Sequence, residues 1–387
     1  MNEKPPHSIE NDRIGLLCLI AIIAVLVGTL WPFNPWPTNK VMWLEDANGL
    51  RFDRAGVVVS KSPLQLPHPT FTQKSCSIEL LVRPANVGVS DTILGFYIPD
   101  DPTHLLVRQW TDGLLVTHDS TDSQGKVKQT KFDVDHAFQT GKLVLLTITS
   151  SPNGSVVYRN ATHPQSFPRF TISPNELAGQ IVLGTSPADY RPWLGDIRGL
   201  AIYAKELTPA EVASHYAEWS ATQITNPSDA DGAIARYRFT ERAGREIHSD
   251  VASGPTLEIA ASFNIPHKAM LKSAVKEFDP TRLYVNDVLL NIAGFIPLGV
   301  ILCVYFSRAR SRSRAIVCAT LFGALLSFTI EVLQAYIPRR VSGTTDIITN
   351  TVGTLLGAAI VNPAFVKNIL QAAKFLPSPK IPPTQAH

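Results

Sequence analysis

Four apolar segments, one near the N-terminus and three near the C-terminus, constrain the fold of this chain most. They run approximately over residues 14–33, 285–306, 315–336 and 347–361. A helix needs about 20 apolar residues to cross the hydrocarbon core of a bilayer, so we expect four membrane-spanning helices, the last of them short. The first segment closes on Trp31-Pro-Phe33 without a small-residue cleavage site, which indicates an uncleaved anchor.

The loop between the second and third segments indicates the orientation. Residues 307–314 carry four arginines in eight positions, and short loops rich in arginine stay in the cytoplasm. We therefore expect residues 1–13, this loop and the tail 362–387 to be cytoplasmic, with an amphipathic helix over residues 365–376. Residues 34–284 and 337–346 then lie outside. The net charge of +3 is too small to indicate a nucleic-acid partner.

The middle of the chain alternates between apolar and polar residues in short runs separated by turn residues. This pattern over residues 49–219 predicts an antiparallel β-sandwich. A hairpin turn is expected at Pro152-Asn-Gly154, and Thr208 with Glu211 forms a capping box that predicts a helix start. Residues 220–283 are expected to be a linker with additional strands, which either complete the sandwich or form a separate hairpin.

The cysteines exclude two kinds of scaffold. Three of the four lie in the apolar segments, which leaves Cys76 alone in the middle region. Neither a disulfide framework nor a Cys/His zinc site is therefore expected. The sequence as a whole predicts a multi-domain protein, in which an all-α four-helix membrane unit carries an extracytoplasmic all-β sandwich.

Three parts of the middle region resemble the concanavalin A-like, laminin-G-type jelly roll, namely residues 76–84, 193–203 and 207–216. The superfamily includes lectins, adhesion modules and glucanases. The paired carboxylates of a glucanase strand, Glu-x-Asp-x-(x)-Glu, do not occur, so we do not expect glycoside hydrolysis, and enzymatic activity is not favoured. Three aromatic residues are candidate glycan contacts, with the core as the alternative position for the last: Trp110, Tyr190 and Trp193.

Calcium is an alternative that the jelly-roll resemblance leaves open. Some laminin-G-type modules bind calcium, and four aspartates could supply oxygen ligands here: Asp100, Asp101, Asp119 and Asp122. Surface loops usually carry such residues without a metal. The interpretation that we favour is a protein with no metal and no cofactor.

Polar residues within the apolar segments fall at one level of the expected membrane unit. A carboxyl group at membrane depth is costly and usually marks a functional site, and residues three or four apart share a helix face. Given the orientation above, eight residues should meet near the outer leaflet: Asp287, Asn291, Glu331, Gln334, Arg339, Arg340, Asp346 and Asn350. They could bind a polar headgroup, with the two arginines holding phosphate. The alternative is internal ion pairing that only fixes helix packing.

The same residues resemble a second family. The segments 291–299, 331–334, 338–340 and 345–357 look like the VanZ-like membrane proteins. The resemblance implies a bacterial multipass membrane protein with a VanZ-like unit over residues 285–361 and the sandwich inserted after its first helix. The family is named for a glycopeptide (teicoplanin) resistance determinant. It implies positions for a site and a role in cell-envelope glycan handling or glycopeptide tolerance, but no reaction.

Three functional hypotheses follow. The leading one is a protein of the bacterial cytoplasmic membrane that binds a membrane lipid or lipid-linked glycan at the polar site. Its sandwich would contact a cell-surface glycan or an envelope protein. The second is a membrane enzyme acting on lipid-linked phosphate, with Glu331 or Asp346 as base or metal ligand. The third is a structural scaffold that recruits an envelope partner. The oligomeric state stays open, because Gly353 and Gly357 could pack within one chain or between two.

Overall fold

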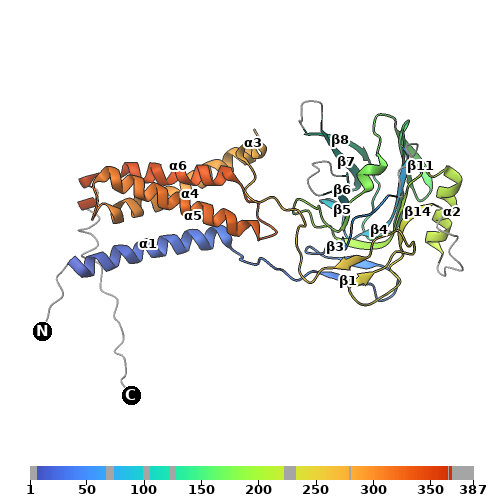
Figure 1. Ribbon diagram of the computed structural model, residues 1–387, viewed down its shortest axis with the longest axis horizontal. Helices are drawn as coiled ribbons and strands as arrows, with labels where there is room; N and C mark the ends of the chain where they lie inside the picture. Colours follow the sequence, from blue (N-terminus) through green and yellow to red (C-terminus); the bar gives the residue numbers. More distant parts are fainter. Residues whose placement is uncertain are drawn as a thin grey trace, which may run out of the picture. The chain divides into compact units, whose positions relative to one another are not determined.

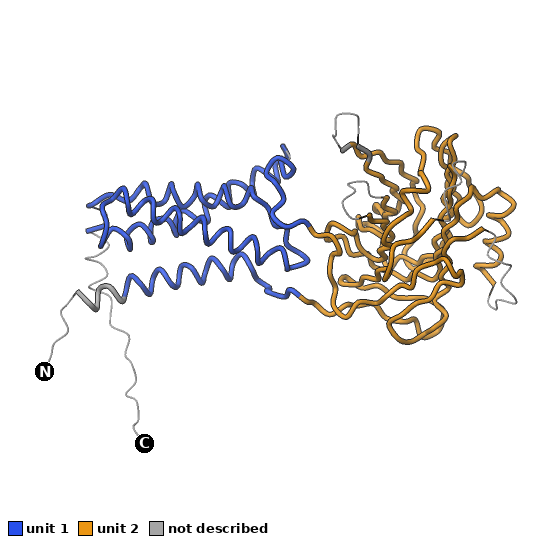
Figure 2. Tube along the Cα trace, viewed as in Figure 1, with its two compact units in different colours: residues 1–35, 269–387 blue, residues 36–268 orange. Residues whose placement is uncertain are grey.

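The structure, a computed structural model, describes residues 7–66, 74–98, 105–121, 127–221, 232–278, 280–364 and 366–367. The chain divides into two compact units (Figure 2). The helical unit comprises residues 1–35 and 269–387, and the sandwich unit comprises residues 36–268. The sandwich unit is thus inserted between the first helix and the remaining helices, as expected from the sequence. The predicted tail helix over residues 365–376 lies almost entirely outside the described residues.

The described residues of the helical unit form four long helices and one short one (Figure 1): α1 His7–Leu30, α3 Ala274–Glu277, α4 Arg282–Phe306, α5 Arg312–Ala335 and α6 Thr344–Ile360. By length and composition α1, α4 and α5 can each cross a membrane. Helix α6 has 17 residues and is shorter than the helices in that group. Three of the four predicted spans therefore have the required length, and a full crossing by α6 stays a prediction.

Glycines allow α6 to pack closely against α4. A Cβ atom on Gly353 would lie 2.3 Å from the carbonyl oxygen of Ile292, and one on Gly357 would lie 2.1 Å from that of Ile296. Small residues let helix backbones approach closely within membranes. The small-residue face of α6 is therefore occupied by a helix of the same chain, which is the first of the two alternatives that the sequence left open.

The sandwich unit contains two antiparallel sheets (Figure 1). The described strands of the first follow the order β1 Val41–Trp43, β2 Leu50–Phe52, β13 Gly195–Tyr203, β4 Cys76–Pro84, β9 Val144–Ser151, β10 Gly154–Arg159 and β11 Thr162–Phe167, with β14 Ala233–Tyr237 also on β13. Those of the second follow the order β15 Glu246–Ile247, β16 Leu257–Ile259, β3 Val58–Ser60, β12 Gln180–Leu183, β5 Ser90–Tyr97, β6 Leu105–Trp110, β7 Gly113–Thr121 and β8 Val127–Val134.

The apolar core lies between these sheets and explains their pattern. Strand β4 and strand β9 pair in register from Cys76 with Ser150 to Val82 with Val144, and their core-facing residues alternate as the sequence indicates. The predicted hairpin turn joins β9 to β10, where Gly154 has a φ of 120°. Strands β14, β15 and β16 pair within the two sheets. The strands of residues 220–283 thus complete the sandwich and do not form a separate hairpin.

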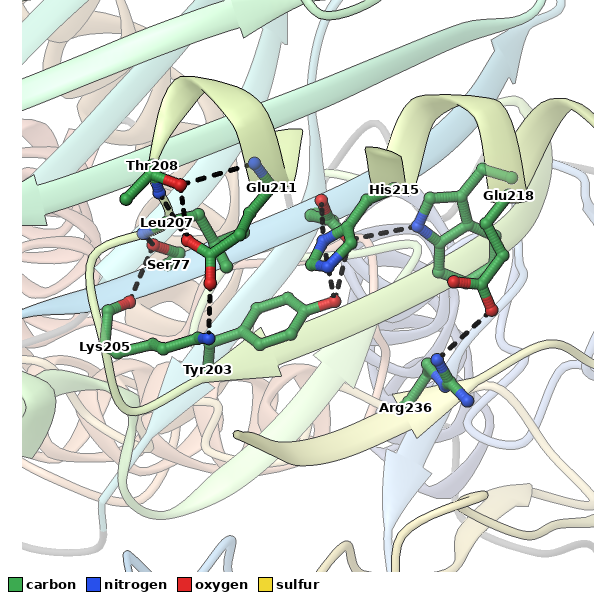
Figure 3. Close-up of polar contacts among 11 residues, drawn as sticks. Ser77, Tyr203, Lys205, Leu207, Thr208, Glu211, His215, Glu218 and Arg236 are labelled. Carbon is green, nitrogen blue, oxygen red and sulfur yellow. Dashed lines mark hydrogen bonds and ion pairs between the residues drawn. The ribbon is translucent and has the colours of Figure 1, made fainter. Parts of the chain in front are cut away.

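Helix α2 (Pro209–Ser220) is held on the first sheet by a buried polar cluster (Figure 3). The helix begins with the predicted capping box of Thr208 and Glu211. The carboxylate of Glu79, fully buried on β4, accepts hydrogen bonds from the Tyr203 hydroxyl at 2.9 Å and the Trp219 indole at 3.0 Å. It also lies 2.9 Å from Nδ1 of His215. One buried carboxylate therefore connects α2 to the sheet through three partners.

This cluster predicts a pH dependence of stability. The hydrogen bond to Glu79 raises the pKa of His215 above its ordinary value, although burial lowers it, and Glu218 adds to the rise. A raised pKa in the folded state means that the stabilisation is complete below the unfolded pKa, about 6.5, and is lost as the pH rises through the folded value. We expect the urea midpoint of the sandwich unit to fall over that window. His215→Gln should remove this part of the dependence, and equal pH profiles for both proteins would contradict the assignment.

Candidate functional site

The helical unit contains a polar cavity of about 590 Å³ at the end where α1 finishes and α4 begins. All eight residues of the predicted polar set line it: Asp287, Asn291, Glu331, Gln334, Arg339, Arg340, Asp346 and Asn350. They come from the first turns of α4 and α6, the last turn of α5 and the loop that joins α5 to α6. The predicted convergence of these helices at one level is therefore what the structure shows.

The floor of the cavity is built by α4, α5 and α6 together. Asn291 Nδ2 donates to Asp346 Oδ1 at 2.7 Å, which ties α4 to α6. Asn350 Nδ2 donates to the hydroxyl of Ser327 at 2.9 Å, which ties α6 to α5. The carboxyl groups of Glu331 and Asp346 both line this cavity. Two neighbouring carboxyl groups repel each other unless a proton or a cation lies between them.

Glu331 also fixes the loop that closes one side of the cavity. Its side chain is 1% exposed, and Oε2 accepts the backbone N–H of Gly343 at 2.7 Å. The hydroxyl of Ser342 donates to the Glu331 carbonyl at 2.8 Å. A Cβ on Gly343 would overlap the carboxylate of Glu277. A side chain at 343 would displace the Glu277 carboxylate. Glu331 contributes to the position of the loop as well as to the floor.

Two charged residues of the wall lie in the segment before α4 and were not predicted. The backbone of Lys272 bonds to Ser342 and Thr344 at 3.0 and 2.9 Å, and Glu277 on α3 accepts the N–H of Thr345 at 3.0 Å. Both side chains line the cavity. These residues lie in a stretch that the sequence predicts to be a linker. The sequence feature that could have indicated these two residues is their charge, close to a predicted span that carries Asp287.

Helix α1 supplies the opposite wall through backbone carbonyls. Gln334 Nε2 donates to the Thr29 carbonyl at 3.0 Å, and the Arg340 guanidinium donates to the Trp31 carbonyl at 2.9 Å. Arg340 therefore anchors the end of α1. The alternative interpretation was an internal ion pair of Arg339 or Arg340 with Glu331 or Asp346, and for Arg340 the described residues show the bond to Trp31 instead. Arg339 is exposed at the rim.

Two buried acceptors in the cavity wall have no hydrogen-bond partner in the described part of the chain. Asn350 is 4% exposed and Thr345 is 9% exposed, yet Asn350 Oδ1 and Thr345 Oγ1 are unsatisfied. A buried polar atom without a partner is costly, and both atoms belong to residues that line the cavity. Within the described ranges no group of three or more His, Cys, Asp or Glu side chains is arranged to hold a metal ion.

The arginine-rich loop lies at the other end of the helical unit. It joins the end of α4 at Phe306 to the start of α5 at Arg312. The Arg312 guanidinium donates to the carbonyls of Ala359 and Val361 at 3.1 Å each, beside the C-terminus of α6. The cavity and the cluster of positive charge are therefore separated by the length of the helices.

The predicted glycan contacts of the sandwich differ in exposure. Trp110 on β6 is 52% exposed, and the Tyr190 hydroxyl donates to the Arg54 carbonyl at 3.0 Å. Trp193 is fully buried and its Nε1 donates to Gln109 Oε1 at 2.7 Å. Proposing Trp193 as a glycan contact was therefore wrong, because its ring fills the core between the sheets and cannot meet a ligand at the surface.

The calcium candidates are mostly outside the described residues. Asp100, Asp101 and Asp122 lie there. Asp119 on β7 accepts from Gln129 Nε2 at 3.0 Å, so it has a partner on the neighbouring strand β8.

Two family models match the chain. The VanZ/LLP1 model matches residues 240–367, which include the cavity floor and α4 to α6. The model of the concanavalin A-like lectin/glucanases superfamily matches residues 60–213, which form most of the sandwich. The chain combines a VanZ-like domain with a concanavalin A-like domain. The VanZ-like match and three helices able to span a bilayer make this a membrane-associated protein. Its predicted cavity residues all lie within the VanZ-like part.

The solved structures named below are distant likenesses of this chain. None of the curated proteins matches it. The receptor-binding domain of botulinum neurotoxin C/D mosaic serotype is similar at a TM-score of 0.34 and 16% identity, over 46% of this chain and 45% of that one. A Bacteroides ovatus protein with a proposed carbohydrate-binding role is similar at a TM-score of 0.35 and 14% identity, over 57% of this chain and 62% of that one. The chain thus spans less than two thirds of either protein, and likenesses this distant carry no argument about ligands.

Proposed function

We propose that this protein resides in the bacterial cytoplasmic membrane and binds a phosphate-bearing headgroup of a membrane lipid or lipid-linked glycan in the cavity of its VanZ-like domain. The observation that carries the proposal is the gathering of three basic and four acidic side chains in one cavity at the end of membrane-spanning helices. Charged groups at such a depth are retained for function. The Arg339 guanidinium at the rim matches phosphate oxygens in geometry and charge.

The same proposal uses the arginine-rich loop to assign the side of the membrane on which the cavity opens. The arginines of residues 307–314 lie at the opposite end from the cavity and favour the cytoplasm. The cavity then opens in the outer leaflet, and the concanavalin A-like domain, inserted between α1 and α4, is extracytoplasmic. The superfamily of that domain includes lectins. We therefore propose that it contacts a cell-surface glycan or an envelope protein, with Trp110 as the candidate aromatic.

Headgroup binding is tested at the rim. Arg339→Ala should weaken binding of a short-chain phosphate-bearing lipid to the purified full-length protein about 10- to 100-fold, since charge-assisted hydrogen bonds contribute about 1.5–3 kcal/mol each. Arg339→Lys should recover part of the loss, because the charge stays but the fork is lost. Arg314→Ala, exposed near the start of α5, is the matched control. Equal affinities for Arg339→Ala and wild type would contradict this part of the proposal.

Sidedness is tested by thiol labelling in intact cells. Val341, 69% exposed in the loop before α6, and Arg310 lie at opposite ends of the helical unit. A membrane-impermeant maleimide should label Val341→Cys and leave Arg310→Cys unlabelled until the cells are lysed. The unsubstituted chain, with three buried cysteines and one half-buried cysteine, gives the background. Labelling of Arg310→Cys in intact cells would place the cavity on the cytoplasmic side and overturn the proposed orientation.

A further inference from the structure

Two basic residues of the cavity, Lys272 and Arg339, are more exposed than the carboxyl groups of Glu331 and Asp346. At the floor lie the buried carboxyl group of Glu331 and the half-buried one of Asp346. At the rim lie the exposed side chains of Lys272 and Arg339, together with the exposed carboxylate of Asp287. A simple anion would meet the two basic side chains favourably and the carboxyl groups of the floor unfavourably. A ligand that satisfies both levels needs a positive group that reaches inward and a negative group that stays near the opening.

The floor also specifies what kind of positive group it fits. Besides the two carboxyl groups, the lining includes Asn350 and Thr345, whose buried atoms Oδ1 and Oγ1 have no hydrogen-bond partner among the described residues. The Asn350 amide nitrogen is already used by Ser327, so the carbonyl oxygen is the atom left to a ligand. Several acceptors in one place call for a group with several donors. A primary ammonium has three N–H donors, whereas a quaternary ammonium has none.

The described walls of the cavity also offer no cage of aromatic rings for a quaternary ammonium. Such groups are recognised by cages of aromatic rings. Among the described residues that line the cavity, Tyr284 alone is aromatic. Apolar side chains of α4 do reach the lining, including Leu290, which is 69% exposed. This gives an acyl chain a place beside the polar floor.

We infer that the cavity selects an aminoalkyl phosphate, with its primary ammonium at the carboxyl groups of Glu331 and Asp346 and its phosphate at Arg339 and Lys272. The inference rests on the proposed headgroup function and names the class of headgroup. Phosphatidylethanolamine and free phosphoethanolamine share this chemistry, and the experiment separates them. Phosphatidylcholine has the same charges without N–H donors, and phosphatidylglycerol lacks the cation.

The test is a titration of the purified full-length protein in detergent with short-chain phosphatidylethanolamine, phosphatidylcholine and phosphatidylglycerol. We expect phosphatidylethanolamine to bind at least about 10-fold more tightly than the other two, because a site built to hydrogen-bond a donor rejects an analogue that lacks it. Displacement of the bound lipid by free phosphoethanolamine at comparable concentration would identify a soluble ligand of the same class. Failure to displace it would identify the lipid.

Variants assign the selectivity to the floor. Glu331→Gln keeps an acceptor for Gly343 and should remove the preference for phosphatidylethanolamine over phosphatidylcholine and phosphatidylglycerol. Thr345→Val, nearly isosteric, should reduce the preference about five-fold through the loss of one hydrogen bond, and it keeps the inference testable if Glu331→Gln does not fold. Glu258→Gln, exposed on β16 of the other unit, should behave as wild type.

Different outcomes separate the choice of headgroup from headgroup binding itself. Equal affinities for all three lipids would overturn the selection of a primary ammonium while the proposed headgroup function stands. The absence of binding to any of the three would overturn both. A preference for phosphatidylethanolamine that survives in Glu331→Gln and in Thr345→Val would also overturn the inference, since it would place the ammonium elsewhere.

Discussion

Replacing Gly353 and Gly357 by leucine is expected to separate α6 from α4 and to abolish the cavity. At both positions a Cβ would lie within 2.3 Å of a backbone carbonyl oxygen of α4. A backbone oxygen cannot rotate away as a side chain can, so the helices must move apart. The contact from α4 to α6 is equally tight, since a Cβ on Gly299 of α4 would lie 2.1 Å from the carbonyl oxygen of Thr354 on α6. Overpacking typically costs about 1–3 kcal/mol at each site.

The measurement is the thermal unfolding of the full-length protein in detergent, together with its lipid affinity. We expect a lower unfolding temperature and the loss of lipid binding for the double variant. Gly294→Leu is the matched control, because a Cβ added at this position of α4 would meet no described atom within 4 Å. Gly353→Leu/Gly357→Leu with wild-type stability and affinity would contradict the packing. If the wild-type protein is a dimer and the double variant is a fully folded monomer, this face belongs instead to an interface between chains.

Removing the buried carboxylate of Glu79 is expected to destabilise the sandwich unit by about 3–5 kcal/mol, the range for breaking a buried charged pair. Glu79→Ala leaves the Tyr203 hydroxyl and the Trp219 indole without their acceptor, and it leaves His215 without its carboxylate partner. Burial and the nearby Glu79 raise the pKa of Tyr203, so this hydroxyl stays neutral and donates. Helix α2 would lose its polar attachment to the sheet.

Pulse proteolysis of the full-length protein in urea measures this effect on the sandwich unit. The control is Glu258→Ala, whose side chain is exposed on β16 and should change the free energy of unfolding by no more than about 0.5 kcal/mol. A Glu79→Ala variant within that same margin of wild type would show that the cluster of Figure 3 does not hold α2.

Much of the site was predictable because two simple rules act together. Spacings of three and four residues put Asp287 with Asn291, and Asp346 with Asn350, on single helix faces. The alternating direction of successive spans then brings those faces to the same end as Glu331. Neither rule depends on the details of packing, so the sequence alone predicts that these groups meet.

The parts that were missed depend on tertiary contacts. Lys272 and Glu277 reach the cavity only because their segment pairs with the loop around Gly343. No periodicity in the sequence indicates such a pairing. Trp193 was ambiguous for a related reason. An aromatic residue just before a strand can face a ligand or the core, and here the Gln109 side chain, from a distant strand, satisfies its indole within the core.

The most direct test of headgroup binding is to identify the lipids that stay bound to the full-length protein when it is purified in detergent. Mass spectrometry of the extracted lipids should show a phosphate-bearing lipid in stoichiometric amount with the wild-type protein and with Arg314→Ala. The same lipid should be strongly depleted in Arg339→Ala of equal purity and folding. Equal amounts of that lipid in all three proteins would contradict the claim that this cavity holds a phosphate headgroup.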